Sequence, residues 1–318
     1  MATPPTTFKI AGVGLRACGW NPPPVTAAAP TPLAFGLSKG FRVFRAGGSR
    51  FASTIPDSWS WRTQGKTTPI FDQGLTPSCV GGGIAAGCYT GMIASNIPFD
   101  GIPSPGITWK GTKDRERSMF LLPGAGTTIP MPAIQESGCG TGDALLWLAQ
   151  EGVTKMTTSK TPDGRFYDLW TAADVTGIKG ATPNTTIELS IDELALARQK
   201  LILGPSMLDT GDPSFVLSLK SALLLGPVWW GGTVDSQVFN FTSTSAPVGP
   251  YITTDPNRGG HLMCIQGWRP SVLGDSTSDW EVQDSWGEDY GDAGYLWARQ
   301  TWAQSGSDVY AANVLKAP

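Results

Sequence analysis

Cys79 and His261 are the residues whose types and positions in the sequence favour nucleophilic chemistry. The segment 72–74 predicts a turn that leads toward Cys79, and apolar residues then recur at helical spacing. Cys79 is therefore expected at a helix N-terminus, where free N–H groups and the helix dipole stabilise a thiolate and a developing oxyanion. The side-chain amide of Gln73 could reach the same point. The alternative interpretation is an ordinary buried cysteine in a helix of small residues.

His261 is the single histidine of the sequence, so a cysteine nucleophile has one imidazole available as its base. It follows Gly260 at the start of an apolar stretch that predicts a strand, and glycine there allows a close approach of the backbone. Asp284 ends another predicted strand, and Trp286 two residues later could cover it. A lone histidine is more often structural, and such an aspartate often caps a turn. The combination of Cys, then His, then an Asp-Ser-Trp-Gly turn is nevertheless a much less likely coincidence.

Composition limits the other functions. The chain has 318 residues, 15% charged residues and a formal net charge of −3, with no basic stripe, which argues against a nucleic-acid partner. The N-terminus lacks the pattern of a secretory signal, and no segment approaches a membrane span, so we expect a cytoplasmic protein without a membrane partner. Five widely spaced cysteines without CxxC indicate neither a disulfide framework nor a zinc site.

The distribution of proline and glycine divides the chain. Residues 1–52 predict an extended arm, which could be a flexible tail, a pro-segment or an arm that contacts a partner. Helices are expected at 79–95, 143–151, 190–203 and 212–225, with a long irregular connection at 96–137. Strands are expected at 228–234, 261–268, 280–284, 294–300 and 308–315. This order predicts an α+β protein with two lobes.

Several motifs together resemble papain-like cysteine peptidases. They are Pro69-Ile-Phe-Asp-Gln73-Gly74 with Ser78-Cys79, then Gly260-His261, then Asp284-Ser-Trp-Gly287 and the following Tyr290-Gly291 and Gly294-Tyr295. The resemblance covers roughly residues 53–318 and is specific at these motifs. It implies a papain-like two-lobed fold with a helical N-terminal lobe at about 67–205. An antiparallel β-sheet or barrel would form the C-terminal lobe at about 206–318, with the active site in the cleft between them.

The resemblance also implies a role for each site residue. Cys79 would be the nucleophile, His261 the general base and then acid, and Asp284 the group that orients the imidazole. Gln73 and the backbone N–H of Cys79 would form the oxyanion hole. The implied substrate-binding residues are Gly138, Cys139, Gly140, Thr141, Gly142, Gly260 and Trp286. A peptide or protein is the implied substrate, and the reaction needs no metal or organic cofactor.

The sequence departs from the family pattern close to the nucleophile. Asp284 stands where the family usually has asparagine, and an aspartate can orient the histidine equally well. Val80 replaces the usual aromatic residue, and Thr76 replaces a cysteine, so the family's usual disulfide at this point cannot form. The glycines 81–83 disfavour a helix by roughly 1 kcal/mol each relative to alanine. They are expected to allow something to pack very close to Cys79.

Two alternative functions remain open at this level. The first is a papain-like scaffold with a vestigial or blocked site that serves as a binding or structural component. The arm of residues 1–52 would suit a virion or another large assembly, so a virion location is the alternative to the cytoplasm. The second is an amidase or a transglutaminase-like acyl transferase, because these enzymes also use Cys, His and Asp in this order.

Overall fold

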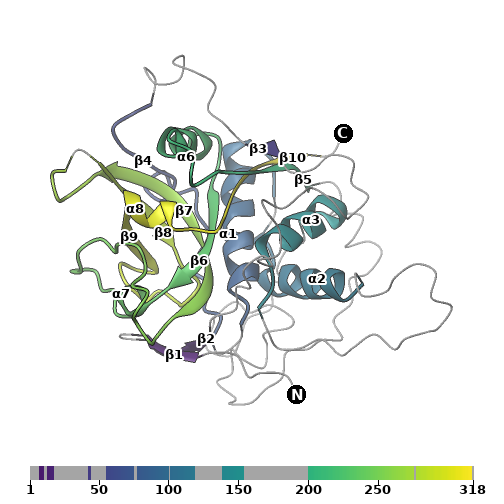
Figure 1. The fold of residues 1–318 in the computed structure, drawn as a ribbon. Coiled ribbons are helices and arrows are strands. Elements are labelled where there is room, and N and C mark those ends of the chain that lie inside the picture. The colour runs from purple at the N-terminus through teal and green to yellow at the C-terminus, as the bar shows by residue number, and fades with distance from the viewer. Residues whose placement is uncertain are drawn as a thin grey trace.

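The computed structural model describes residues 7–10, 13–17, 42–43, 55–74, 77–99, 101–118, 138–153, 200–275 and 277–316. Within these ranges α1 (Cys79–Ala94) lies between a β-sheet and two further helices, α2 (Pro105–Ser118) and α3 (Thr141–Glu151) (Figure 1). The helices and the sheet form two lobes, as the sequence predicts. The junction between them is the face of α1 that packs on the sheet strands β6 and β7.

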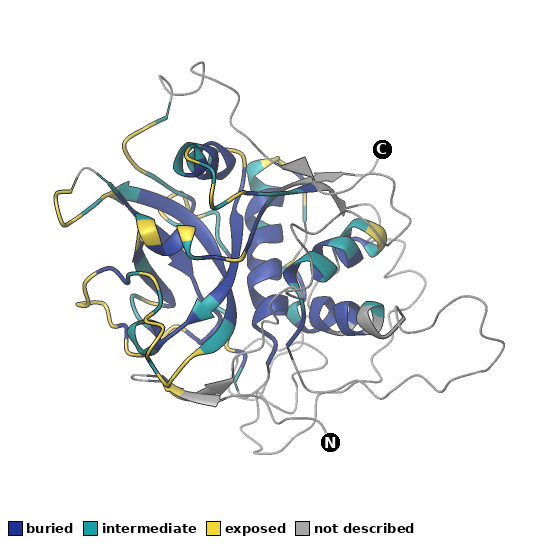
Figure 2. Ribbon diagram, in the orientation of Figure 1, coloured by how far each residue is buried: buried dark blue, intermediate teal, exposed yellow. Residues whose placement is uncertain are grey.

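Helix α1 is buried along most of its length (Figure 2). The sequence of α1 has no polar face, and this agrees with the way neighbouring elements cover the helix on several sides. Helices α2 and α3 pack against it on one side, and Trp229 and Leu262 of the sheet belong to the same apolar cluster. A helix that is apolar all round is typical of the interior of a protein. Its N-terminal residue, Cys79, is therefore held at the junction of the two lobes.

The glycines of α1 explain how the helix comes so close to its neighbours. A Cβ atom on Gly81 would lie 2.2 Å from the carbonyl oxygen of Pro105, and one on Gly82 would lie 2.9 Å from Cβ of Ser285. Both distances are shorter than real contacts. Glycine lowers the stability of a helix, but here it lets neighbouring segments pack against the backbone of α1 more closely than any larger residue permits. This confirms the expectation that something packs very close to Cys79.

The sheet has the strand order β3-β5-β10-β6-β7-β8-β9, with β4 paired to β7. Neighbouring strands are antiparallel except for β3 and β5, which run parallel. The strands are β3 (Arg42–Val43), β4 (Trp59–Ser60), β5 (Lys200–Met207), β6 (Val228–Val234), β7 (Gly259–Pro270), β8 (Ser278–Gln283), β9 (Tyr295–Arg299) and β10 (Asp308–Lys316). Among these described strands the sheet stays open, so of the two expected forms, sheet and barrel, the sheet is observed.

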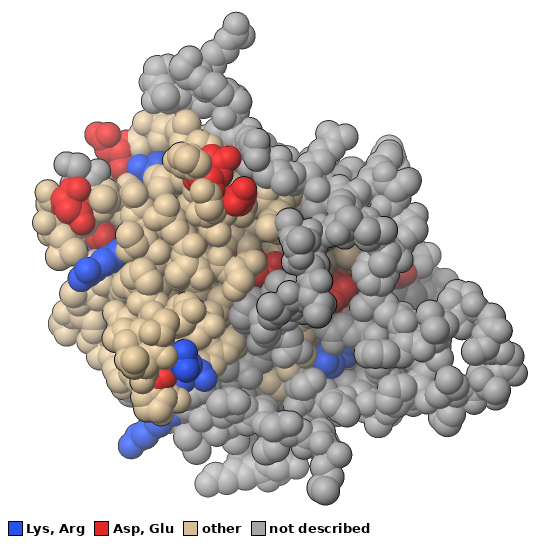
Figure 3. Space-filling model, viewed as in Figure 1, with Lys and Arg blue, Asp and Glu red and all other residues tan. Residues whose placement is uncertain are grey.

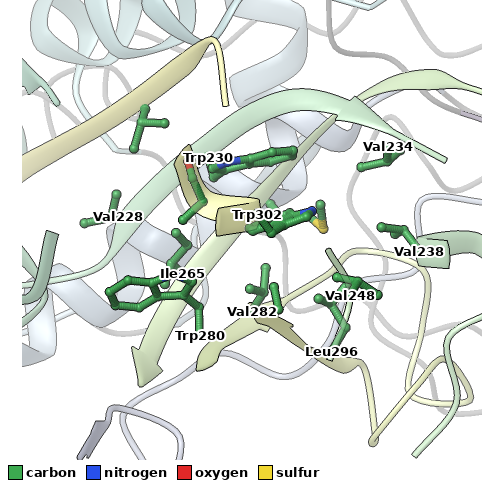
Figure 4. Close-up of a cluster of buried hydrophobic side chains, with 14 of the residues drawn as sticks. Val228, Trp230, Val234, Val238, Val248, Ile265, Trp280, Val282, Leu296 and Trp302 are labelled. Atoms are coloured by element: carbon green, nitrogen blue, oxygen red, sulfur yellow. Dashed lines mark hydrogen bonds between the residues drawn. The ribbon is translucent and has the colours of Figure 1, made fainter. Parts of the chain in front are cut away.

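The core of the β lobe lies between the sheet and the short helices α6 (Phe215–Leu223), α7 (Ser236–Phe239) and α8 (Gln300–Gln304). Trp230 of β6 stacks on Trp302 of α8 with ring centroids 3.8 Å apart, and valine and leucine side chains surround the pair (Figure 4). Large aromatic residues contribute most of the apolar area that such a core buries. This core fixes β6, β7 and β8, and His261 lies in β7.

Most of the predicted elements are confirmed. Helix α1 and helix α3, with Gly152 as its C-cap, lie where the sequence places them, and α6 falls inside the expected 212–225. Strands β6 to β10 match the five expected strands within a few residues. The spacing of apolar residues was sufficient to predict these elements, because each of them buries one continuous apolar face.

Two predictions were wrong. The connection at 96–137, expected to be irregular, contains α2, because Pro105 suits the first turn of a helix and Trp109 is then buried against α1. The helix expected over 190–203 gives way to β5 from Lys200 onward, because pairing with β10 overrides helix propensity. Residues 119–137 and 190–199 lie outside the described residues. The lobe boundary expected near residue 205 falls within β5 and stays a prediction.

The N-terminal arm contains regular structure in its described parts. Strands β1 (Thr7–Ile10) and β2 (Gly14–Ala17) form an antiparallel hairpin, and β3 pairs with β5 at one edge of the main sheet. The arm was expected to have few regular elements, and the rest of residues 1–52 lies outside the described residues. The described strands nevertheless contact the body of the protein at two separate places.

No membrane-spanning candidate is found among the described helices, because none is both long and apolar enough. Within the same part of the chain no group of three or more His, Cys, Asp or Glu residues is arranged to hold a metal ion. On the face shown in Figure 3, acidic and basic side chains of the described residues are scattered rather than gathered in one broad patch.

Candidate active site

Cys79 is the first residue of α1 and is completely buried. At this position its backbone N–H belongs to the first turn, whose donors have no acceptor within the helix. The positive end of the helix dipole also lies here, and it stabilises a negatively charged sulfur. This is the position at which the sequence predicts Cys79, the start of a helix.

His261 and Asp284 come together because β7 and β8 are antiparallel neighbours. Cys264 of β7 lies opposite Gln283, so the chain that leaves β8 at Asp284 passes beside the start of β7. His261 Nε2 is 2.7 Å from Asp284 Oδ1, and both side chains are buried. The same carboxylate oxygen accepts a hydrogen bond from the backbone N–H of Ser285 at 2.6 Å. Asp284 therefore fixes the orientation of the imidazole ring.

The environment of His261 favours the imidazolium form. Burial of the ring opposes a positive charge, but the charges of Asp284 and Cys79 and the hydrogen bond to Asp284 outweigh it. Together they raise the pKa of His261 from 6.5 to about 10. The ring is therefore protonated throughout the neutral range.

The second ring nitrogen, Nδ1, is the one left for an interaction with Cys79. Since Nε2 is bound to Asp284, the interaction of His261 with the Cys79 thiol involves Nδ1. This contact influences the charge of the ring but does not meet standard hydrogen-bond geometry, and Nδ1 has no other partner among the described residues. Looser nucleophile–base contacts are common in unliganded sites. The ring thus bridges Cys79 and Asp284.

Trp286 covers the imidazole on one face. The two rings are stacked with centroids 4.4 Å apart and planes 20° from parallel. Behind the indole, Tyr290 makes an edge contact at 5.1 Å and Phe239 of α7 lies 5.8 Å away. Because Trp286 is fully buried, it keeps water from one side of the His261–Asp284 hydrogen bond. This strengthens the hydrogen bond by lowering the local dielectric constant.

Gln73 is joined to the turn that carries Asp284. The backbone N–H of Gln73 donates to the carbonyl of Ser285 at 2.9 Å, and the N–H of Gly287 donates to the carbonyl of Phe71 at 2.9 Å. The Ser285 hydroxyl also donates to Oε1 of Gln73 at 2.6 Å. Because Oε1 of Gln73 accepts this hydrogen bond, the Nε2 group lies at the other end of the amide, where it can act as a donor. The arrangement brings an amide donor and the Cys-His-Asp set into one site.

Ser285 is the site residue to which the sequence assigned no role. It contacts Gln73 through its hydroxyl and carbonyl, Asp284 through its N–H, and Gly82 of α1 through its Cβ. Its place inside the Asp-Ser-Trp-Gly motif was the only signal available. The structure adds that this one residue connects the turn of Gln73, the turn of Asp284 and the helix of Cys79.

The expected substrate-binding segment lies in the helical lobe. Gly138 and Cys139 precede α3, Gly140 is its N-cap, and residues 141 and 142 form its first turn. The buried side chain of Lys113 in α2 donates to the carbonyl of Gly138 at 2.9 Å, which fixes the start of this segment. Gly260 lies next to His261 in the β lobe. The role of these residues in binding remains a prediction.

Solved structures share this architecture, and the chain has the papain-like two-lobed fold. Xylellain, a cysteine protease from Xylella fastidiosa, matches with a TM-score of 0.64 at 18% identity over 100% of both chains. Procathepsin B S9 from Trypanosoma congolense matches with a TM-score of 0.54 at 13% identity, over 87% of this chain and 83% of that one. Bromelain from Ananas comosus, in complex with the E64 inhibitor, matches at 0.51 and 16% identity, over 82% and 100%. No protein-family model and no curated protein matches the sequence.

Proposed function

We propose that this protein is a papain-like thiol peptidase that hydrolyses peptide bonds. The observation that supports it most is the single buried imidazole, whose pKa is raised in part by the Cys79 thiol at the start of α1. Its Nε2 lies 2.7 Å from Asp284. The solved neighbours with this fold are cysteine proteases by their names. Fold and residue types thus agree on the reaction class.

In the proposed reaction the Cys79 thiolate attacks the carbonyl carbon of the scissile peptide bond, and the bond electrons move to the oxygen. The imidazolium of His261 then donates its Nδ1 proton to the leaving amine as the carbon–nitrogen bond breaks. A water molecule, deprotonated by the now neutral His261, attacks the thioester and releases the acid. Asp284 keeps the ring in place through both steps.

The oxyanion of each tetrahedral intermediate needs two donors that are already in position. We assign these to the backbone N–H of Cys79 and the Nε2 group of Gln73, whose amide is fixed by Ser285. Donors held in place before the reaction stabilise the developing charge without reorganising. No metal or organic cofactor takes part in these steps.

The test is covalent labelling followed by a cleavage assay. The full chain is incubated at neutral pH with a peptidyl epoxide, and the modified residue is identified by mass spectrometry. Cys79 is expected to be labelled, whereas Cys88 and Cys264 serve as internal controls because burial raises the pKa of both thiols. Cys79→Ala is the matched control. If Cys79 is not labelled and no peptide in a fluorogenic panel is cleaved, the peptidase function is refuted.

Replacement of Gln73 by alanine is expected to reduce kcat/KM for a cleaved peptide by about 10²-fold, because one oxyanion donor is lost. Gln73→Glu keeps the acceptor for Ser285 but removes the donor, so it should lose a similar factor. Steady-state kinetics on both variants measures the effect. A Gln73→Ala enzyme with the activity of the natural one would show that the amide takes no part.

One observation favours a second candidate function, a scaffold whose site is blocked and which acts as a binding component of a larger assembly. Cys79 and His261 have no exposed surface, so a peptide reaches the sulfur only after some segment moves. Labelling by iodoacetamide without labelling by any peptidyl epoxide would support this candidate. The amidase or transglutaminase-like alternative is separated by measuring amine incorporation beside hydrolysis.

A further inference from the structure

Two of the described side chains of the hairpin β1–β2, Ile10 and Val13, pack on the core of the β lobe. Ile10 is 1% exposed and belongs to the same apolar cluster as Val238, Phe239 and Trp286, although it lies in an arm rich in proline and glycine. Val13 of the same hairpin is partly buried against this cluster. Strand β1 contacts α7, and Figure 1 places the hairpin beside that helix. The hairpin is therefore an integral part of the lobe rather than a loosely attached tail.

Helix α7 connects this anchor to the active site. It has only four residues, so its position depends on packing from both sides rather than on its own stability. Strand β1, which carries the buried Ile10, contacts α7, and Phe239 of that helix lies 5.8 Å from Trp286, which stacks on His261. The carbonyl of Val238 accepts a hydrogen bond from Tyr290, which makes an edge contact with Trp286. A continuous series of contacts thus leads from the hairpin to the imidazole.

We infer that Ile10 is a positioning residue for the reaction: by packing against α7 it holds Trp286 over His261. The N-terminal hairpin then acts as an intramolecular activator of the site. If the hairpin were instead an inhibitory segment, weakening its packing would raise the activity. The kinetic part of this inference rests on the proposed peptidase function, whereas the structural part does not.

The structural part can be followed at one resonance. His261 is the only histidine, so its Hε1 proton gives a single assignable imidazole signal in the NMR spectrum. The stacked indole of Trp286 at 4.4 Å shifts this signal upfield through its ring current. In the full chain, Ile10→Ala is expected to reduce this upfield shift and to change the pH titration of His261. Lys9→Ala, at an exposed position of the same strand, is expected to change neither.

The kinetic part is a split between kcat and KM. Because misplacing a catalytic group slightly costs much of the rate, Ile10→Ala is expected to lower kcat on the order of tenfold with KM little changed. The Ile10→Val variant should keep most of the natural kcat. Leu219→Ala, which removes a buried side chain of α6 in the same core, controls for loss of stability and should leave the His261 signal in place.

Each result either supports or overturns the inference. An unchanged His261 signal in Ile10→Ala, or a rise in kcat/KM, overturns it. If Ile10→Ala does not fold, Ile10→Val is measured instead. Its His261 signal should move in the same direction by a smaller amount, and an unchanged signal overturns the inference. If the natural protein neither cleaves peptides nor labels at Cys79, the proposed function fails, while the NMR comparison still tests the positioning role.

Discussion

Replacing Asp284 by alanine is expected to lower kcat/KM for peptide hydrolysis by up to about 10⁴-fold, the size of the loss in kcat when the aspartate that orients the histidine of a Ser-His-Asp triad is changed. The variant removes the acceptor 2.7 Å from His261 Nε2 and the negative charge that supports the imidazolium. Asp284→Asn is the matched comparison, since an amide oxygen can accept the same hydrogen bond without the charge. It is expected to retain most of the activity at neutral pH.

The two variants separate orientation from charge in the pH profile. With a pKa of about 10, His261 loses its proton, and the enzyme its acid, only as the pH rises through about 10. In Asp284→Asn the pKa is expected to fall by about 1–3, because a neighbouring opposite charge is removed. The alkaline limb of kcat/KM and the NMR titration of His261 should move together to lower pH. An unchanged limb in Asp284→Asn would show that the aspartate charge does not set the pKa.

The same pKa has a consequence for stability. Because the pKa of His261 in the folded protein lies above its ordinary value of 6.5, the folded state binds this proton more tightly than the unfolded state. This contribution to the free energy of unfolding is fully present below about pH 6.5 and declines as the pH rises toward 10. Denaturation midpoints at pH 6 and pH 10 should differ more in the natural protein than in Asp284→Asn.

Gly81→Ala is expected to destabilise the protein by roughly 1–3 kcal/mol or more, since overpacking a rigid site costs this much. The new Cβ would lie 2.2 Å from the carbonyl oxygen of Pro105 and 3.1 Å from Cβ of Trp109. A backbone atom of a packed helix cannot move aside as a flexible side chain can. The gain of about 1 kcal/mol that alanine brings to a helix does not compensate for this clash.

Chemical denaturation of Gly81→Ala measures the loss, and its residual peptidase activity reports whether Cys79 has moved. Gly249→Ala is the control, because the nearest atom to its new Cβ is 3.7 Å away and its backbone has no positive φ. It should leave the denaturation midpoint nearly unchanged. If Gly81→Ala is as stable as the natural protein, the close packing of α1 on α2 does not constrain the nucleophile's helix.

The sequence alone was sufficient where the decisive information is local. The turn before Cys79 and the apolar spacing after it predict α1, and the strand patterns predict β7 and β8 with His261 and Asp284 at their ends. Residue type then limits the chemistry, because the chain has one histidine to pair with a cysteine. These features depend on neighbours within a few residues, which is why they can be recognised without a structure.

The tertiary structure decided what depends on contacts between distant segments. Strand β5 forms because β10 offers it hydrogen bonds, and α2 forms because Trp109 is buried against α1. The link from Ser285 to Gln73 joins residues 212 positions apart, and no local pattern encodes such a distance. The sequence therefore determined which groups could react, whereas contacts between distant segments determined how these groups are held. The packing of one side chain depends on many neighbours from distant parts of the sequence, and these neighbours meet only when the chain folds.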